Sequence, residues 1–154
     1  MGEALKKRIS QENFESHQQE AMLNLLVAAD FLRNKLEDAF NQFGISNGQY
    51  NVLRILKGAH PDGHSRCEII RRLLEKAPDV TRLVDRLEAQ GLAERDRSET
   101  DRRLSITRIT PKGLELVAAL EPPLREVERY FTERVSRKEC RELSRICEGL
   151  YEEA

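Results

Sequence analysis

The sequence lacks several features that would place it in large functional classes. No apolar run approaches the roughly 18 residues that a membrane-spanning helix needs, so no membrane partner is expected. The opening stretch MGEALKKRISQENFES has no apolar core of the kind that directs export, which favours a cytoplasmic location. The three cysteines, Cys67, Cys140 and Cys147, do not make a disulfide framework, and an odd number suits a reducing compartment.

Signatures of catalysis and of cofactor binding are missing as well. There is no P-loop, no nucleotide-binding glycine pattern, no HExxH motif and no plausible nucleophile triad, so we expect neither an enzyme nor a cofactor. His60, His64 and Cys67 are close in sequence, but they straddle a turn and a helix start, whereas a zinc site needs three or four converging ligands. A loop with surface histidines is therefore favoured over a metal site.

Charge is abundant but nearly balanced. Charged residues make up 34% of the 154 residues and the formal net charge is -1, so the long charge blocks of a disordered chain are absent. The balance argues weakly against a nucleic-acid partner, because DNA-binding domains are often basic. Arginine far outnumbers lysine, however, and arginine is well suited to phosphates and bases. The positions of the arginines therefore matter more than the total charge.

Helical periodicity and N-terminal capping patterns organise most of the chain. Ser or Thr followed three residues later by Glu or Gln, and Thr110 before Pro111, mark helix starts. Pro122 and Pro123 should kink or split the helix that contains them. The predicted helices span His17–Phe43, Asn47–Lys57, Arg66–Glu75, Pro78–Gln90, Pro111–Val135 and Arg137–Tyr151.

Two short strands, Leu92–Arg97 and Arg102–Ile109, should form a hairpin around the polar tip Ser98–Asp101. This order predicts a mainly α protein with a small β-hairpin, in which residues 46–110 form a winged helix-turn-helix domain. Residues 1–45 and 111–154 carry wider apolar stripes than a small domain needs, so we interpret them as dimerisation helices. A heptad-like seam on the last helix supports this interpretation: Cys140, Leu143, Cys147 and Leu150.

The helix that follows Pro78 would be the recognition helix, whose first turns meet base edges in the major groove. Thr81 and Arg82 are within reach of bases, and Arg86, one turn further on, suits a phosphate. Asp79 and Asp85 count against this interpretation unless they orient neighbouring arginines. Ordinary surface charges on a small helical domain are the alternative.

Further candidate DNA contacts lie on either side of this helix. Ser65 and Arg66 start the preceding helix, where free N–H groups favour a phosphate. The hairpin tip is placed to reach the adjacent minor groove, which attracts arginine when it is narrow. A solvated hairpin with compensating charges would have the same net charge, so position favours the functional interpretation. The candidates at the tip are Arg97, Asp101, Arg102 and Arg103.

The block from Val80 to Val117 closely resembles the MarR (multiple antibiotic resistance regulator) family of winged-helix transcription factors. The motifs that carry the resemblance are T-R-L-V-D-R-L-E, G-L, the D-x-R of the wing and T-P-x-G, and QYNVLRIL resembles the family's second helix. The resemblance implies a homodimer built from both chain ends, an inverted-repeat target in double-stranded DNA, and usually repression that a small ligand relieves. It favours Arg103 over Arg102 as the minor-groove residue. The family pattern is not followed in the stretch RRLLEKAPDVT, so the resemblance does not identify which residues contact bases.

The resemblance also suggests where an effector would bind, between the DNA-binding lobe and the dimerisation helices. Phe31, Phe40, Tyr50 and Leu53 are the candidates, although each taken singly is better explained as a core residue. Two alternative functions stay open. One is a cysteine-based redox-responsive regulator of the same fold, in which Cys140 and Cys147 could pair only across a dimer. The other is a winged-helix module that binds proteins without binding DNA.

Overall fold

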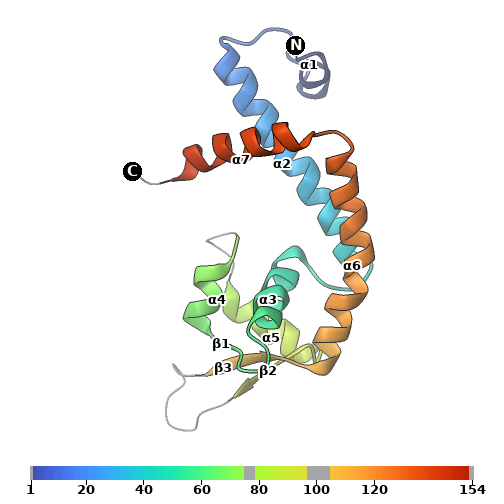
Figure 1. The fold of residues 1–154 in the computed structure, drawn as a ribbon, viewed down its shortest axis with the longest axis vertical. Coiled ribbons are helices and arrows are strands. Elements are labelled where there is room, and N and C mark those ends of the chain that lie inside the picture. The colour runs from blue at the N-terminus through green and yellow to red at the C-terminus, as the bar shows by residue number, and fades with distance from the viewer. Residues whose placement is uncertain (1, 75–78, 97–104, 153–154) are drawn as a thin grey trace.

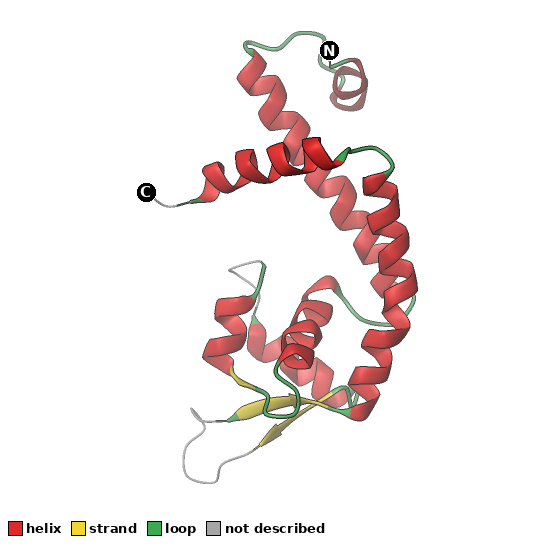
Figure 2. Ribbon diagram, viewed as in Figure 1, coloured by secondary structure: helices red, strands yellow, loops and turns green. Residues whose placement is uncertain are grey.

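The computed structural model describes residues 2–74, 79–96 and 105–152. Most of the chain is helical, as predicted, and one small sheet lies near the middle of the sequence (Figure 2). No helix within the described ranges is long and apolar enough to cross a membrane. The elements are α1 (Glu3–Ile9), α2 (His17–Asn41), α3 (Asn47–Gly58), β1 (His64–Ser65), α4 (Arg66–Arg72), α5 (Val80–Ala89), β2 (Ala93–Asp96), β3 (Ile106–Ile109), α6 (Pro111–Thr132) and α7 (Arg137–Tyr151).

Local capping explains why most helices start where the sequence predicts. Ser46 and Ser136 each accept a hydrogen bond from the backbone N–H three residues ahead, at Gln49 and Glu139. The side chains of Gln49 and Glu139 accept the serine N–H in return, at 3.1 Å and 2.8 Å, which completes the capping boxes predicted at these two helix starts. Ser65 caps α4 through its hydroxyl in the same manner. The ends of these helices are therefore determined by residues that are neighbours in the chain.

The sheet has three strands in the order β1-β3-β2, all antiparallel, where the sequence predicted a two-stranded hairpin. The additional strand pairs His64 with Thr107 and Ser65 with Ile106. A Cβ on Gly63 would lie 2.3 Å from the carbonyl oxygen of Thr107, so only glycine allows the chain to approach β3 this closely. With two residues, β1 is too short to show the alternation by which a strand is recognised in a sequence.

Two helical predictions need correction. The helix α6 runs unbroken from Pro111 to Thr132 through Pro122 and Pro123, so it is not split. Each of these prolines removes one backbone hydrogen bond, but the residues four positions earlier are exposed, so water is close to their carbonyl groups. The short helix α1 was not predicted. Its Leu5 is buried, and its Arg8 pairs with Asp30 of α2 at 3.8 Å.

The predicted buried face of α4 was too wide. Ile69 is fully buried and Leu73 is half-buried, as expected. The apolar spacing in the predicted helix Arg66–Glu75 also predicts that Ile70 and Leu74 are buried, but they are 40% and 78% exposed. The helix α4 ends at Arg72, earlier than the predicted Glu75, so Leu73 and Leu74 follow the helix and do not continue its buried side. Within α4, Ile69 and Ile70 point to different sides, and a short helix on the edge of a small domain packs with one side only.

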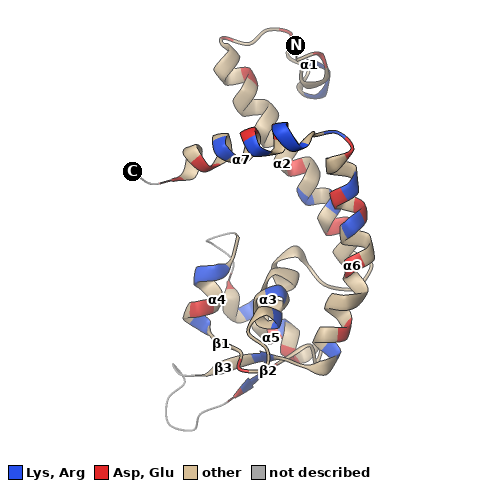
Figure 3. Cartoon of the chain, viewed as in Figure 1, with Lys and Arg blue, Asp and Glu red and all other residues tan. Residues whose placement is uncertain are grey.

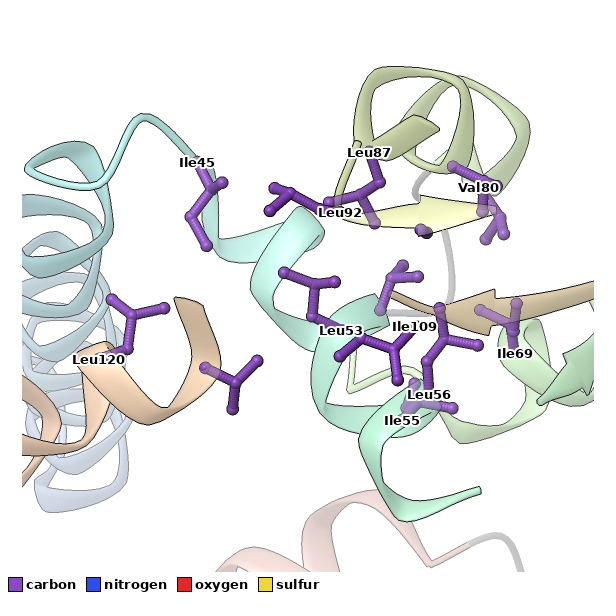
Figure 4. Packing of buried hydrophobic residues seen from close by; sticks show 14 of the residues in the cluster. Ile45, Leu53, Ile55, Leu56, Ile69, Val80, Leu87, Leu92, Ile109 and Leu120 are labelled. Carbon is purple, nitrogen blue, oxygen red and sulfur yellow. The ribbon is translucent and has the colours of Figure 1, made fainter. Parts of the chain in front are cut away.

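The hydrophobic core lies where α3, α4, α5, α6 and the sheet meet (Figure 4). Leu53 and Leu56 of α3 are fully buried beside Ile69, Leu87 and Ile109 from three other elements. We call α3, α4, α5 and the three strands the winged-helix lobe. The buried residues of α5, Val80, Val84 and Leu87, face this core, so packing determines which face of α5 is buried and its opposite face is left to solvent.

The remaining helices form an arm that projects from the lobe (Figure 1). By the arm we mean α1, α2, α6 and α7. The helices α2 and α6 pack side by side, and α7 runs back from the far end of α6. No residue of α7 is buried, and its apolar side chains Leu143, Ile146 and Leu150 are 38%, 47% and 68% exposed. The apolar face predicted for α7 therefore has no covering partner within the described part of one chain.

Candidate nucleic-acid interface

The helix α5 presents a polar face on the side opposite its core contacts. Its N-cap is Asp79, whose carboxylate accepts a hydrogen bond from the backbone N–H of Arg82 at 3.3 Å. Thr81, Arg82 and Arg86, the three residues predicted to meet DNA, are all exposed on this helix. A helix fixed from behind by aliphatic side chains and free in front has the form that major-groove reading requires.

Asp79 holds Arg82 as well as capping the helix. The second carboxylate oxygen of Asp79 lies 3.2 Å from the Nε of Arg82, while the Arg82 side chain stays 80% exposed. An acidic residue at this point would repel phosphates if it stood alone. Here it is paired with Arg82 of the same turn. The recognition-helix prediction required such a pairing of Asp79 with a neighbouring arginine.

Asp85 is also paired, with an arginine that the sequence did not single out. Arg95 of β2 bonds to the Asp85 carboxylate, and its Nε lies 3.1 Å from Glu88 on the next turn of α5. The backbone N–H of Arg95 donates to the other oxygen of Glu88 at 3.0 Å. No fixed sequence spacing announces a contact between a helix and the strand after it, so these partners could be found only from the fold.

The start of α4 lies near α5, as the helix-turn-helix prediction requires. Arg66 is exposed at the first position of the helix, next to the capping Ser65. Arg66, Thr81 and Arg95 line one cavity of about 520 Å³ between α4, α5 and the sheet. The fold thus brings together residues from both helices of the predicted pair.

The α4 helix carries its own acid-base cluster. A hydrogen bond from Arg71, with a smaller contribution from Arg72, lowers the pKa of Glu68 below its ordinary value. Glu68 therefore stays ionised, and its charge is balanced within α4. Basic and acidic residues alternate along α4 and α5 and also occur on the strands of the lobe (Figure 3).

The described part of the wing is its base, the strands β2 and β3. Arg97, Asp101, Arg102 and Arg103, the candidates at its tip, lie outside the described residues, as do Glu75 and Pro78 at the predicted ends of α4 and α5. The strands that carry the tip pair Ala93 to Asp96 with Ile109 to Ile106. Arg108 of β3 forms an ion pair with Asp96 of β2 at 3.1 Å, so the two strands are also joined on their exposed side.

Comparison with known proteins agrees with this geometry. A family model described as the MarR family matches residues 43–104. The crystal structure of a MarR transcription factor from Planctomyces limnophilus is 38% identical, with a TM-score of 0.69 over 88% of this chain and 98% of that chain. The chain belongs to the MarR family. It is therefore a transcriptional regulator with a DNA-binding winged-helix fold, and the proteins it matches are regulators and not enzymes.

Two further relatives extend the comparison. A transcriptional regulatory protein described for the hcr operon of Thauera aromatica is 29% identical over 121 residues, which are 73% of this chain and 72% of that protein. The MepR–DNA complex of S. aureus has a TM-score of 0.72 at 23% identity, covering 90% of this chain and 97% of that chain. At this identity the second comparison concerns the fold alone. That fold is seen there bound to DNA.

The MarR motifs have a physical basis in this chain. In the T-P-x-G motif, Thr110 caps α6 by accepting the N–H of Gly113 at 3.1 Å, and its hydroxyl donates to the Gly91 carbonyl at 2.7 Å. A Cβ at Gly113 would lie 2.2 Å from the carbonyl oxygen of Leu92, so a side chain cannot fit there. The motif thus anchors α6 directly against the turn that joins α5 to β2.

The four predicted effector residues do not converge on one space. Phe40 and Leu53 are buried in the core, and Tyr50 stacks on Phe40 with ring centroids 4.5 Å apart. Burial raises the pKa of Tyr50, so its hydroxyl stays protonated at neutral pH. Phe31 lies earlier in α2 than Phe40, and its ring centroid is 5.6 Å from that of Tyr130 of α6. Binding of a ligand to these four residues stays a prediction.

A different cavity opens between α2 and α6, with a volume of about 490 Å³. Lys35 and Arg134 lie over the ring of Tyr130, at 4.4 Å and 3.7 Å from its centroid. Asp38, Glu126 and Glu133 also line this cavity, so its wall carries both signs of charge. Sequence spacing could not predict this cavity, because all the residues of the lobe lie between α2 and α6 in the chain.

The three cysteines considered earlier lie on two different helices, α4 and α7. All three cysteines are free: Cys67 is exposed on α4, whereas Cys140 and Cys147 are half-buried on α7. The thiol of Cys140 lies 3.6 Å from the carbonyl oxygen of Val135. Among the residues that the structure describes, no three His, Cys, Asp or Glu side chains are grouped so as to hold a metal ion.

Proposed function

We propose that this MarR-family protein is a cytoplasmic homodimeric repressor that binds an inverted-repeat operator in double-stranded DNA and leaves it when a small molecule binds. The observation that carries the DNA-binding part is the exposed face of α5, with Thr81, Arg82 and Arg86 outward and the helix locked from behind. The paired acids Asp79 and Asp85 remove the electrostatic objection to that face. A symmetric dimer would place two such helices about one DNA turn apart, roughly 34 Å.

The unpaired apolar surface of the arm supports the dimer. Leu143, Ile146 and Leu150 of α7 are exposed in one chain, and so are Met22 and Leu26 of α2, at 56% and 59%. Apolar residues at helical spacing on two helices far apart in sequence would make a continuous interface with a second copy. Burial of such a face contributes roughly 25 cal/mol for each Å² removed from water, and the cost of ordering two chains against each other is subtracted from that gain.

The cavity between α2 and α6 supports release by a ligand. Its volume of about 490 Å³ lies within the range of small-molecule sites. The helix α6 begins directly after β3 of the lobe, and a short turn joins its end to α7. A ligand that separates α6 from α2 would therefore move the lobes relative to the dimer helices. Such a ligand acts only through its higher affinity for the released form.

Selection of bound sequences from random duplexes tests the DNA-binding proposal. The expected product is an inverted repeat, bound by two chains in sedimentation, with an affinity that falls steeply as salt rises. Single asymmetric half-sites would overturn the dimeric operator. A module that binds only proteins would instead show no salt-dependent retention on duplex DNA.

The wing arginine is tested separately, because its proposed role concerns a different groove. Replacing Arg103 by alanine should reduce the preference for narrow A·T-rich flanks without changing the core half-site. Asp101→Ala should act in the same direction, since we propose that this carboxylate orients the guanidinium. Tighter binding by Asp101→Ala would mean that the acid only repels phosphate.

A further inference from the structure

Arg95 connects the base of the wing to the recognition helix at three successive points. Its Nη2 lies 3.4 Å from the carbonyl oxygen of Thr81 and bonds to the carboxylate of Asp85, and its Nε lies 3.1 Å from Glu88. The three positions are four and three residues apart, so they form one stripe along two turns of α5. A single side chain from β2 therefore spans most of the length of the helix that faces DNA.

The backbone of β2 is held by the same stripe. Glu88 accepts the N–H of Arg95 with one carboxylate oxygen, at 3.0 Å, and pairs with the guanidinium through the other. Arg95 faces Thr107 of β3 in the sheet register, and Thr107 is buried. The Glu88 carboxylate thus ties α5 to β2, which in turn pairs with β3.

We infer that Arg95, Asp85 and Glu88 form a positioning clamp that sets the angle between the recognition helix and the wing, and through it the sequence specificity of DNA binding. This inference rests on the proposed function. The N–H donors of a guanidinium lie in one fixed plane, so the groups that accept from them are held in a defined orientation. The aliphatic contacts of Val80, Val84 and Leu87 behind α5 are not directional and leave that angle less defined.

The clamp contacts are partly shielded from water, which strengthens them. The side chains of Arg95 and Glu88 are 23% and 24% exposed, whereas Asp85 is 55% exposed at the rim. Asp85 is therefore an acid on the DNA-facing helix whose charge is balanced by Arg95. Two simpler roles compete with this assignment: Asp85 as a surface acid that repels phosphate, and Arg95 as a direct phosphate contact.

The three roles predict different changes in DNA affinity and in its ratio between specific and non-specific duplexes, so they can be separated in the full-length protein. Binding of Asp85→Asn, Arg95→Gln and the double variant would be measured by fluorescence anisotropy on the selected operator and on a scrambled duplex, over a range of salt. The clamp predicts that Asp85→Asn lowers the ratio of specific to non-specific affinity about tenfold, a loss comparable to that of one base contact. The double variant should lose little more than either single variant, because the residues act as one unit.

Controls distinguish positioning from a loss of folding. Partial unfolding lowers both affinities together, so the specificity ratio responds to helix orientation and not to stability alone. Glu94→Gln removes a carboxylate from the same strand on its other face, and it should leave the ratio unchanged. Arg95→Lys keeps the charge without the fork and should not restore specificity. If Arg95→Gln fails to fold, Asp85→Asn still carries the test, since Asp85 is at the rim.

Several outcomes would overturn the clamp. Tighter binding of Asp85→Asn to both duplexes would identify Asp85 as a repelling surface acid. A salt dependence reduced by about one phosphate contact in Arg95→Gln, with the ratio unchanged, would identify Arg95 as a phosphate ligand. If the wild-type protein itself binds no duplex in a salt-dependent manner, the proposed function fails, and the clamp falls with it.

Discussion

The winged-helix lobe buries leucine side chains in its core, whereas the end of the arm leaves its leucines exposed. Leucines 53, 56 and 87 of the lobe are fully buried, whereas Leu143 and Leu150 on α7 are 38% and 68% exposed. The three helices and the sheet of the lobe enclose one core, which also includes Phe40 of α2 and Val117 and Leu120 of α6. The arm leaves its apolar faces open, and a helix of 15 residues without packing is marginally stable in water. We conclude that the lobe is held by its own packing, while the proposed dimer would hold the end of the arm.

The largest effect should come from a change in the core of the lobe. Leu87→Ala leaves a cavity behind the recognition helix and should lower the free energy of unfolding by about 2–5 kcal/mol. Leu150→Ala is the matched change in the arm, and in dilute protein it should alter unfolding of the lobe by less than about 0.5 kcal/mol. Urea titration monitored by circular dichroism measures both. Equal losses in the two variants would remove the contrast between the regions.

Charges placed on the open face of α7 should separate assembly from folding. Leu143→Asp combined with Leu150→Asp should dissociate the dimer at micromolar concentration and thereby weaken operator binding, because a carboxylate cannot be buried unpaired. Sedimentation velocity and anisotropy report the two effects. The control is Leu74→Asp, at a residue of the lobe that is 78% exposed, which should leave the assembly intact. A wild-type protein that sediments as a compact monomer would contradict the proposal.

A change on the exposed face of the lobe should affect recognition and leave assembly unchanged. Arg82→Ala should cost about 1–3 kcal/mol of operator binding and relax the preference at one position in each half-site. Asp79 would still cap α5, so the fold should be retained. Arg125→Ala on α6 removes an arginine of the arm that pairs with Glu121 and should not change the preferred sequence. Equal effects of the two substitutions on the selected sequence would show that α5 does not read bases.

The smallest effects should come from the two complete capping boxes, one in each region. Ser46→Ala and Ser136→Ala should each cost about 1 kcal/mol, the first in unfolding of the lobe and the second in dimer affinity. Calorimetry and sedimentation distinguish the two equilibria. If Ser136→Ala lowers only the stability of the lobe, α7 must belong to the core of a single chain.

The cap of α7 also has a pH dependence. Hydrogen bonds from Ser136 lower the pKa of Glu139 below its ordinary value of 4.5. A carboxyl whose folded pKa is lowered stabilises the structure above the unfolded pKa, and this contribution is lost as the pH falls through the folded value. Dimer affinity should therefore weaken slightly below about pH 4.5, and Glu139→Gln should reduce that change.

Much of the fold could be predicted from residues that are close in sequence. The boxes at Ser46 and Ser136, the cap at Thr110 and the periodic stripe of α5 each depend on contacts within a few residues, so their spacing is visible in the chain. The predicted exposure of Thr81, Arg82 and Arg86 followed from the same periodicity. The four candidates at the wing tip lie outside the described residues and stay predictions.

The sequence by itself therefore determined the helices from α2 to α7, their order and the face of α5 that meets solvent, because those features arise from hydrogen bonds and side-chain spacing within single elements. Only the tertiary structure decided which apolar faces are covered, that His64 and Ser65 join the sheet, and that Arg95 reaches Asp85 and Glu88. These contacts join separate elements, so their geometry depends on how the elements pack and has no fixed spacing along the chain.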